Sequence, residues 1–192
     1  MSIHDFFRGR DVNIRELSDY IERLPSTIRI EEACSLSGDE QSALWEVSAG
    51  FRPVTIEDFV PASVPAMTQV IHHGKNSLPM FSRFQKRFCR PDEPGSTELW
   101  GYNHQAMAPF TGPGYFVTRD APAGEVVIDY LRVPPRKPHG WPKIMPNSAR
   151  LSRFIYYLTQ DFMRGVSTHV TIGRATRKGK PMDNWFVLCR ED

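Results

Sequence analysis

The sequence has few cysteines and no long apolar run. Its three cysteines, Cys34, Cys89 and Cys189, are widely spaced and form no C-x-x-C pair, which argues against a disulfide framework or a cysteine-rich zinc site. No apolar stretch approaches the roughly 18 residues that a membrane helix needs, and the first residues lack the pattern of a signal peptide. We therefore expect free thiols and a cytoplasmic protein.

Several motifs of known chemistry are also missing. Gly74-Lys75 lacks both the following Ser or Thr and the earlier glycine of a nucleotide-binding phosphate loop. The chain has no H-E-x-x-H and no His-x-Asp or His-x-Glu, which argues against a zinc or iron centre. It has no G-x-S-x-G, the motif of serine nucleophiles. We expect neither a metal nor a cofactor.

The charges are distributed unevenly along the chain. The first 60 residues hold six arginines, no lysine and twelve carboxylates, whereas the other 132 residues hold 18 basic and 10 acidic groups. The simplest interpretation is that the acidic segment packs on the basic one. A net charge of only +2 gives no basis for predicting a nucleic-acid partner.

Residues 1–90 are expected to form a helical segment. A stripe of apolar residues predicts a first helix that ends before Pro25. Ser37 and Glu40 have the spacing of a capping box, and Thr55 and Asp58 repeat that signal for a short helix. The stripe of the first helix consists of Ile14, Leu17, Tyr20, Ile21 and Leu24.

Residues 91–192 are expected to form an antiparallel sheet with one helix. Apolar residues at three- and four-residue steps predict the helix at 151–166, between the third and fourth strands. The order β-β-β-α-β-β indicates an α+β fold in which the helical segment and the sheet form one compact domain. The expected strands are β-prone runs separated by turn residues, at 97–103, 115–118, 125–133, 169–176 and 183–189.

Both faces of this sheet are apolar. In the strand at 125–133, Val126 and Ile128 lie on one face, and Val127 and Leu131 lie on the other. One helix does not easily cover two faces. Either the N-terminal helices cover the second face, or the curved sheet encloses a cavity of its own as a partial barrel.

The C-terminal half resembles a known class of domains. The stretch "EVVIDYLRVPP", followed by the expected helix and by "VTIGRATRKG" and "NWFVLCRE", is similar to the closing strands of small bacterial lipocalin-like ligand-binding domains. An apolar strand, Gly-Arg-Ala and a final aromatic strand carry the resemblance, which covers at most residues 97–192. It implies a cavity for a small apolar molecule rather than a reaction.

Two polar clusters are candidate sites. We interpret "VIHHGKNSLPMF", residues 70–81, as a corner between a helix and a loop, in which a histidine is either hydrogen-bonded within a capped turn or contacts a ligand near a cavity mouth. The second cluster, at 102–105, ends a strand beside a Met- and Phe-rich loop, and is either part of a pocket or a polar strand end at the surface. With the tyrosines and the tryptophan of the later strands, the candidate ligand-binding residues are His72, His73, Lys75, Tyr102, Asn103, His104, Met107, Phe110, Tyr115, Tyr130 and Trp185.

Asp129 is the carboxylate that most needs an explanation, because it falls inside an apolar strand. Arg132, Arg174 or a tyrosine hydroxyl could pair with it, which would make it structural. Left unpaired in a cavity it would act as a general base opposite His104 or Tyr130.

A basic segment at 80–90 is predicted to be an amphipathic helix. Phe81, Phe84 and Phe88 share one helical face, with the cations mostly elsewhere. Such a helix either packs into the core with its cations solvated or paired to the acidic helices, or lies on an anionic membrane or a phosphate backbone.

The leading functional hypothesis is a protein that binds a small apolar or aromatic molecule in a pocket of the curved sheet. The alternative is a cofactor-free isomerase or cyclase that uses Asp129 and His104 as an acid–base pair. A third hypothesis is an interaction module that presents the basic helix at 80–90.

Overall fold

The computed structural model describes residues 1–9, 11–78, 82–105, 111–149 and 151–192. The N-terminal part of these residues is helical, as predicted. It consists of a 3₁₀-helix η1 (Ile3–Phe7) and the α-helices α1 (Ile14–Glu22), α2 (Ser26–Ala33), α3 (Gly38–Val47) and α4 (Ile56–Phe59).

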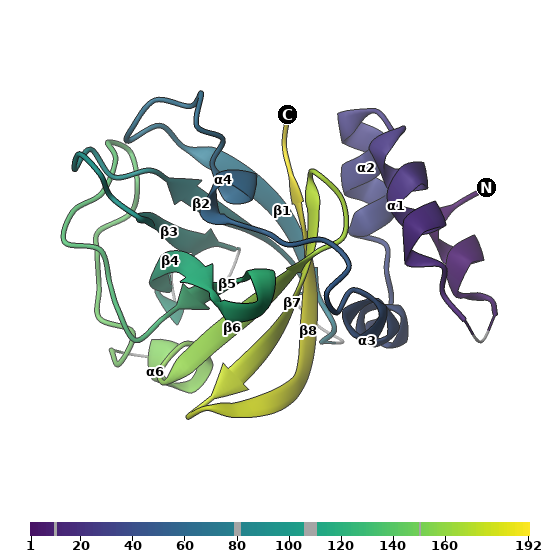
Figure 1. The fold of residues 1–192 in the computed structure, drawn as a ribbon. Helices are drawn as coiled ribbons and strands as arrows, with labels where there is room; N and C mark the ends of the chain where they lie inside the picture. Colours follow the sequence, from purple (N-terminus) through teal and green to yellow (C-terminus); the bar gives the residue numbers. More distant parts are fainter. Residues whose placement is uncertain (10, 79–81, 106–110, 150) are drawn as a thin grey trace.

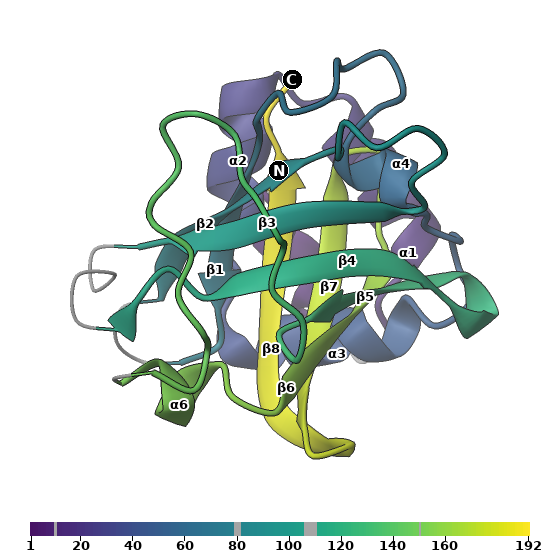
Figure 2. The same ribbon diagram turned by 90° about the vertical axis from the view of Figure 1, so that its left-hand side faces the viewer.

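Eight strands follow, and they close into a barrel (Figures 1 and 2). Each strand pairs antiparallel with the next in sequence, and β1 pairs with β8, so the sheet has no free edge. Within the described residues, the short helices η2 (Pro122–Gly124) and α6 (Ser152–Ile155) lie between strands of this series. The strands are β1 (Val70–Asn76), β2 (Arg83–Cys89), β3 (Glu98–His104), β4 (Tyr115–Ala121), β5 (Glu125–Asp129), β6 (Thr159–Gly165), β7 (Val170–Arg177) and β8 (Lys180–Arg190).

Local sequence signals explain where the helices begin and end. Asn13 caps α1, since its side chain accepts hydrogen bonds from the backbone of Arg15 and Glu16, and the helix ends before Pro25. At α3 the predicted capping box is confirmed: Glu40 N donates to Ser37 Oγ at 3.3 Å and Ser37 N donates to Glu40 Oε2 at 2.7 Å.

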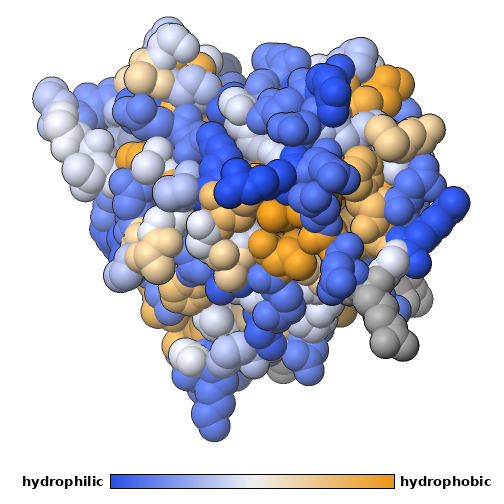
Figure 3. Space-filling view, turned by 45° about the vertical axis from the view of Figure 1, so that its right-hand side comes forward, coloured by the Kyte–Doolittle hydropathy of each residue, from blue (hydrophilic) through white to orange (hydrophobic). Residues whose placement is uncertain are grey.

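The helices α1 to α3 cover the outer face of the barrel beside β7 and β8 (Figure 1). Leu17, Ile21 and Leu44 from these helices are fully or almost fully buried against Ile172 and Val187 of the strands. The helices therefore cover an apolar outer face of the sheet, which is one of the two arrangements predicted from the sequence. In the view of Figure 3, hydrophilic side chains form most of the surface, with an apolar patch among them.

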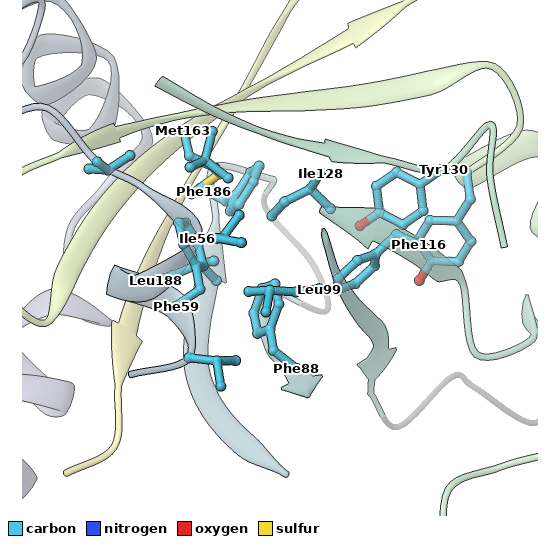
Figure 4. Packing of buried hydrophobic residues seen from close by; sticks show 14 residues of the cluster. Ile56, Phe59, Phe88, Leu99, Phe116, Ile128, Tyr130, Met163, Phe186 and Leu188 are labelled. Atoms are coloured by element: carbon cyan, nitrogen blue, oxygen red, sulfur yellow. The ribbon is translucent and has the colours of Figure 1, made fainter. Parts of the chain in front are cut away.

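The other arrangement is also present, because the sheet encloses a core of its own. The short helix α4 closes one end of the barrel, where Ile56 and Phe59 pack against inward-facing residues such as Phe88, Leu99 and Leu188 (Figure 4). Because these side chains fill that end, a cavity can form only towards the other end of the barrel.

The prediction of a basic helix at 80–90 was wrong. Residues 83–89 form β2, with Phe84, Lys86 and Phe88 facing the barrel interior and Arg83 and Arg87 facing outward. A spacing of four residues places Phe84 and Phe88 on one face in both a helix and a strand, so the two periods cannot be told apart there. The interaction-module hypothesis loses its basis, because no basic amphipathic helix forms in the described residues of this segment.

The predicted helix at 151–166 was also wrong for most of its length. It ends after the four residues of α6, and Leu158 adopts a positive φ of 59°, which breaks the helix. Residues 159–165 then alternate between buried and half-buried positions as β6. The helix of the β-β-β-α-β-β order is therefore replaced mainly by a strand.

The histidine-containing segment at 70–81 is not a corner either. Residues 70–76 form β1, which joins β2 to β8 and closes the barrel. The helices end at Phe59, so β1 and β2 fall within the segment expected to be helical. The predicted meander is confirmed as β3, β4 and β5, and the predicted C-terminal hairpin is confirmed as β7 and β8.

None of the described helices has the length and apolar composition that crossing a membrane requires. All three cysteines are buried and unpaired.

Candidate functional site: a cavity above a buried lysine

A cavity of about 390 Å³ lies inside the barrel at the end opposite α4. Its walls come from the final residues of β1, β3 and β7, from the first half of β2, β6 and β8, and from α6. Its volume falls in the lower part of the range of small-molecule sites. The lining residues used below are Lys86, Asn103, Tyr130, Tyr156, Asp161, Ala175, Arg177, Asp183 and Phe186.

Lys86 lies at the base of this cavity. It points inward from β2, and only 3% of it is exposed. Its Nζ donates hydrogen bonds to Asn103 Oδ1 at 3.0 Å, to Asp161 Oδ2 at 3.2 Å and to the hydroxyl of Tyr130. Asn103 Nδ2 also donates to the Tyr130 hydroxyl at 3.0 Å. We call Lys86, Asn103, Tyr130 and Asp161 the Lys86 network.

Aromatic rings surround the Lys86 ammonium group. Its Nζ lies 5.0 Å from the ring centroids of Tyr130 and Phe186, 5.2 Å from that of Phe116 and 5.6 Å from that of Phe84. These distances are within the range of cation–π attraction. The rings therefore stabilise a cation at this point and exclude water from it.

Glycines on neighbouring strands make room for the phenylalanine rings. Gly101 is paired with Phe116 and Gly173 with Phe186 across adjacent strands. A Cβ atom at Gly101 would lie 2.3 Å from the Phe116 ring, and one at Gly173 would lie 2.4 Å from the Phe186 ring. Each ring thus occupies the space that a side chain would fill at any residue other than glycine.

Burial shifts the titration of the Lys86 network. Desolvation lowers the pKa of Lys86 and raises the pKa of Asp161, while the attraction between the two groups opposes both shifts. Desolvation and the nearby Asp161 carboxylate raise the pKa of Tyr130. The Lys86–Asp161 pair can be charged, as ammonium and carboxylate, or neutral, as amine and carboxylic acid. Burial brings these two states closer in free energy than they are in water.

The remaining walls combine rings with balanced charges. Tyr156 stacks on Tyr130 with the ring centroids 5.1 Å apart. Two cationic residues, Lys86 and Arg177, and two anionic residues, Asp161 and Asp183, line the cavity. The charges of the lining residues that the structure describes therefore cancel formally.

No family model, curated protein or solved structure matches this chain. The closed antiparallel barrel has the eight strands of a full lipocalin-type barrel. This agreement is one of architecture, and membership of a lipocalin-like family stays a prediction.

The structure places two of the predicted ligand-binding residues, Asn103 and Tyr130, in the cavity. His72 points into the barrel at the closed end, where it stacks on Phe59 and its ring N–H donates to the Phe59 carbonyl at 2.9 Å. Burial lowers the pKa of His72 to about 3, so this histidine is neutral. Among the residues that the structure describes, no three His, Cys, Asp or Glu side chains could together hold a metal ion.

The other predicted ligand-binding residues that the structure describes do not line the cavity. Three of them occupy outward positions near the N-terminal helices: His73 lies 3.9 Å from Glu191, Lys75 donates to the backbone of Ser35, and Trp185 packs in the core between helices and strands. Tyr102 and Tyr115 belong to a separate outer cluster with Trp141, and His104 is exposed. Met107 and Phe110 lie outside the described residues.

Asp129 and His104 are not brought together. Asp129 aligns with Val117 and, through it, with Trp100, four residues before His104 on β3. Two strand spacings and four residues of rise give a Cα separation of roughly 16 Å.

Asp129 faces outward, where its carboxylate accepts hydrogen bonds from Leu131 N at 2.9 Å and Gln160 Nε2 at 3.1 Å. The Arg119 guanidinium also lies 4.0 Å from this carboxylate, so Asp129 is paired, but with a different arginine from the predicted Arg132 and Arg174, which pair with Glu98 and Asp183.

The sequence interpretation missed Lys86 and Asp161 as site residues. Both are charged residues at inward positions of strands whose neighbouring inward residues include Phe84, Phe88 and Met163. The same reasoning that singled out Asp129 applies to them once the segments are recognised as strands.

Proposed function

We propose that this protein binds a small, uncharged, partly aromatic molecule in the barrel cavity. The observation that carries the proposal is the cavity of about 390 Å³ with ring-lined walls and a polar group of four residues at its base. Binding sites of small molecules commonly combine mainly apolar walls with a few fixed polar groups.

Stability alone does not account for the Lys86 network. A buried ion pair loses hydration that its mutual attraction repays only in part, and well-packed apolar residues of similar volume are often as stable or more stable. Lys86 and Asp161 are nevertheless buried beside a cavity. A role in contacting a guest molecule explains why charged residues occupy this position.

The balance of charges favours a ligand without net charge. An anionic group drawn towards Lys86 would also approach the Asp161 carboxylate, which lies 3.2 Å from the same nitrogen. A hydroxyl, carbonyl or amide group can interact with the network without that repulsion, while aromatic or aliphatic parts contact Tyr130, Tyr156 and Phe186.

Binding fits the structure better than the acid–base enzyme hypothesis, because Asp129 and His104 lie on the outer face and far apart. The proposed ligand contacts are instead the Lys86 network and the aromatic residues that line the cavity.

The experiment that tests this proposal uses N-phenyl-1-naphthylamine, an uncharged dye whose fluorescence rises in apolar surroundings. Titration of the protein should give a saturable increase in fluorescence. Ala175 lies at an inward position on β7 and lines the cavity, so Ala175→Phe should fill part of it and weaken binding about tenfold or more, equivalent to at least about 1.4 kcal/mol.

The matched control is Ala66→Phe, the same chemical change at an exposed position before β1. It should bind the dye as the wild-type protein does, and thermal unfolding should show that both variants are folded. Absence of saturable binding to the wild-type protein, or equal affinity of a folded Ala175→Phe variant, would refute the proposal.

A further inference from the structure

The chemistry at the base of the cavity suggests which functional group the ligand carries, an inference that rests on the proposed binding function. All six lysines lie within the described residues, and only Lys86 is buried and lines the cavity. Its amino nitrogen contacts a carboxylate, a phenol and an amide oxygen. This arrangement is more than a charge that anchors a ligand, because it contains an amine beside a group that can accept its proton.

We propose that Lys86 binds an aldehyde group of the ligand covalently, as a protonated imine. In the first step the Lys86 ammonium transfers one proton to the Asp161 carboxylate, which leaves a neutral amine beside a neutral carboxylic acid. The lone pair of the amine, freed by rotation about the Cε–Nζ bond, attacks the carbonyl carbon, and the electrons of the C=O π bond move to the oxygen.

The remaining steps return the proton and release water. The new alkoxide takes one proton from the nitrogen that has just formed the C–N bond, which gives a carbinolamine. The Asp161 carboxylic acid then gives its proton to the carbinolamine hydroxyl, the C–O bond breaks, and water leaves as the C=N bond forms. The products are a protonated imine, an Asp161 carboxylate and one water molecule, so no oxidant or reductant is needed.

The surroundings of Lys86 suit this product. The protonated imine has the same charge as the original ammonium, so Asp161 remains its counter-ion and the formal charge of the cavity does not change. The four rings at 5.0 to 5.6 Å stabilise the iminium as they stabilise the ammonium. They also limit access of the water that would hydrolyse it.

The pKa shifts of Lys86 and Asp161 favour the same proton transfer that their short distance allows. Burial favours the neutral amine of Lys86 and the neutral acid of Asp161, which are the forms that the first step produces. The Tyr130 hydroxyl and Asn103 Oδ1 can hold the amine in place during the attack. Exposed lysines such as Lys143 and Lys178 have no comparable surroundings.

The test uses 2-naphthaldehyde, an aromatic aldehyde that cannot undergo conjugate addition to cysteine. The full-length protein is incubated with the aldehyde and sodium cyanoborohydride near neutral pH, which reduces any imine to a stable secondary amine. Intact mass and peptide mapping then locate the label. Lys86 should be labelled in preference to every exposed lysine, because the cavity holds the aldehyde beside its amine and burial favours the neutral form of that amine.

Two controls separate cavity chemistry from general lysine reactivity. The alcohol 2-naphthylmethanol, which cannot form an imine, should protect Lys86 but not the exposed lysines. Ala175→Phe should reduce labelling of Lys86 and leave the labelling of Lys143 and Lys178 unchanged.

The possible failures are distinguishable. Labelling confined to exposed lysines, in a protein that still binds N-phenyl-1-naphthylamine, would overturn covalent capture and leave the proposed binding function intact. Absence of both labelling and dye binding would overturn both proposals. Labelling of Lys86 that 2-naphthylmethanol does not reduce would also contradict the inference, because the reaction would then not depend on an occupied cavity.

Discussion

Removing one member of the Lys86–Asp161 pair should destabilise the protein far more than removing both. The two groups are 3.2 Å apart, and only 3% of Lys86 and 5% of Asp161 is exposed. Lys86→Met leaves the Asp161 carboxyl without its cation, and Asp161→Leu leaves the Lys86 ammonium without its anion. Each single substitution should cost about 3–5 kcal/mol of unfolding free energy, a large part of the roughly 5–15 kcal/mol of a typical domain.

The double variant Lys86→Met/Asp161→Leu should recover most of this loss. It buries no unpaired charge, and Asn103 and Tyr130 still hydrogen-bond to each other through Asn103 Nδ2 and the Tyr130 hydroxyl. We expect its stability to lie within about 1–2 kcal/mol of the wild-type value, which corresponds to a coupling energy of about 4 kcal/mol or more.

The two single variants should also respond to pH in opposite directions. In Lys86→Met the pKa of Asp161 stays above its unfolded value, so the folded state binds more protons and stability falls as pH rises from about 4. In Asp161→Leu the pKa of Lys86 stays below its unfolded value, so the unfolded state binds more protons and stability rises with pH towards about 10.

Urea unfolding of the four proteins at several pH values measures these effects through the midpoint and the slope. An exposed ion pair provides the control: Arg136→Met removes a contact of 2.9 Å with Asp92, and because both groups are about half exposed it should cost less than about 1 kcal/mol. Additive single-variant effects, or pH profiles with the same sign for both, would refute the reasoning.

Two further predictions concern the barrel core. The pKa of His72 is lowered to about 3 from 6.5, so this side chain is neutral in the folded protein and takes up a proton on unfolding below pH 6.5. The unfolding free energy should therefore fall by about 2 kcal/mol as pH drops from 6.5 to 5. In urea unfolding at several pH values, His72→Phe should remove this part of the pH dependence, and an unchanged pH dependence would count against the prediction. Gly101→Ala places a Cβ 2.3 Å from the Phe116 ring, so it should lower the unfolding free energy by about 1–3 kcal/mol, whereas Gly9→Ala, with no atom within 4 Å of the added Cβ, should change it by less than about 0.5 kcal/mol. Equal effects of the two glycine substitutions would show that the ring does not need the space.

The N-terminal helices could be predicted from the sequence because their signals are local. A capping box spans four residues, and a proline restricts the residue before it, so the ends of α1 and α3 depend on residues close in the chain. The meander β3 to β5 and the hairpin of β7 and β8 were predictable for a similar reason, since turn residues separate short β-prone runs.

The strands β2 and β6 were predicted as helices because their apolar spacing fits both periods. Residues four apart, such as Phe84 and Phe88, or Leu158 and Phe162, share a face in a helix and in a strand alike. The first segment becomes a strand because it pairs with β1 and β3, and the second becomes a strand because it pairs with β5 and β7. No pattern within either segment contains that information.

The sequence by itself determined the helical N-terminal part, the antiparallel character of the later strands and the apolar nature of both sheet faces, because these depend on neighbouring residues and on periodicity. Only the tertiary structure decided that the sheet closes, and with it which charged residues point inward. Lys86 comes from β2 and Asp161 from β6, 75 residues apart in the chain. They meet because pairing of β1 with β8 closes the sheet around a common interior. There the two side chains stay paired, because burying either charge without the other would be strongly unfavourable.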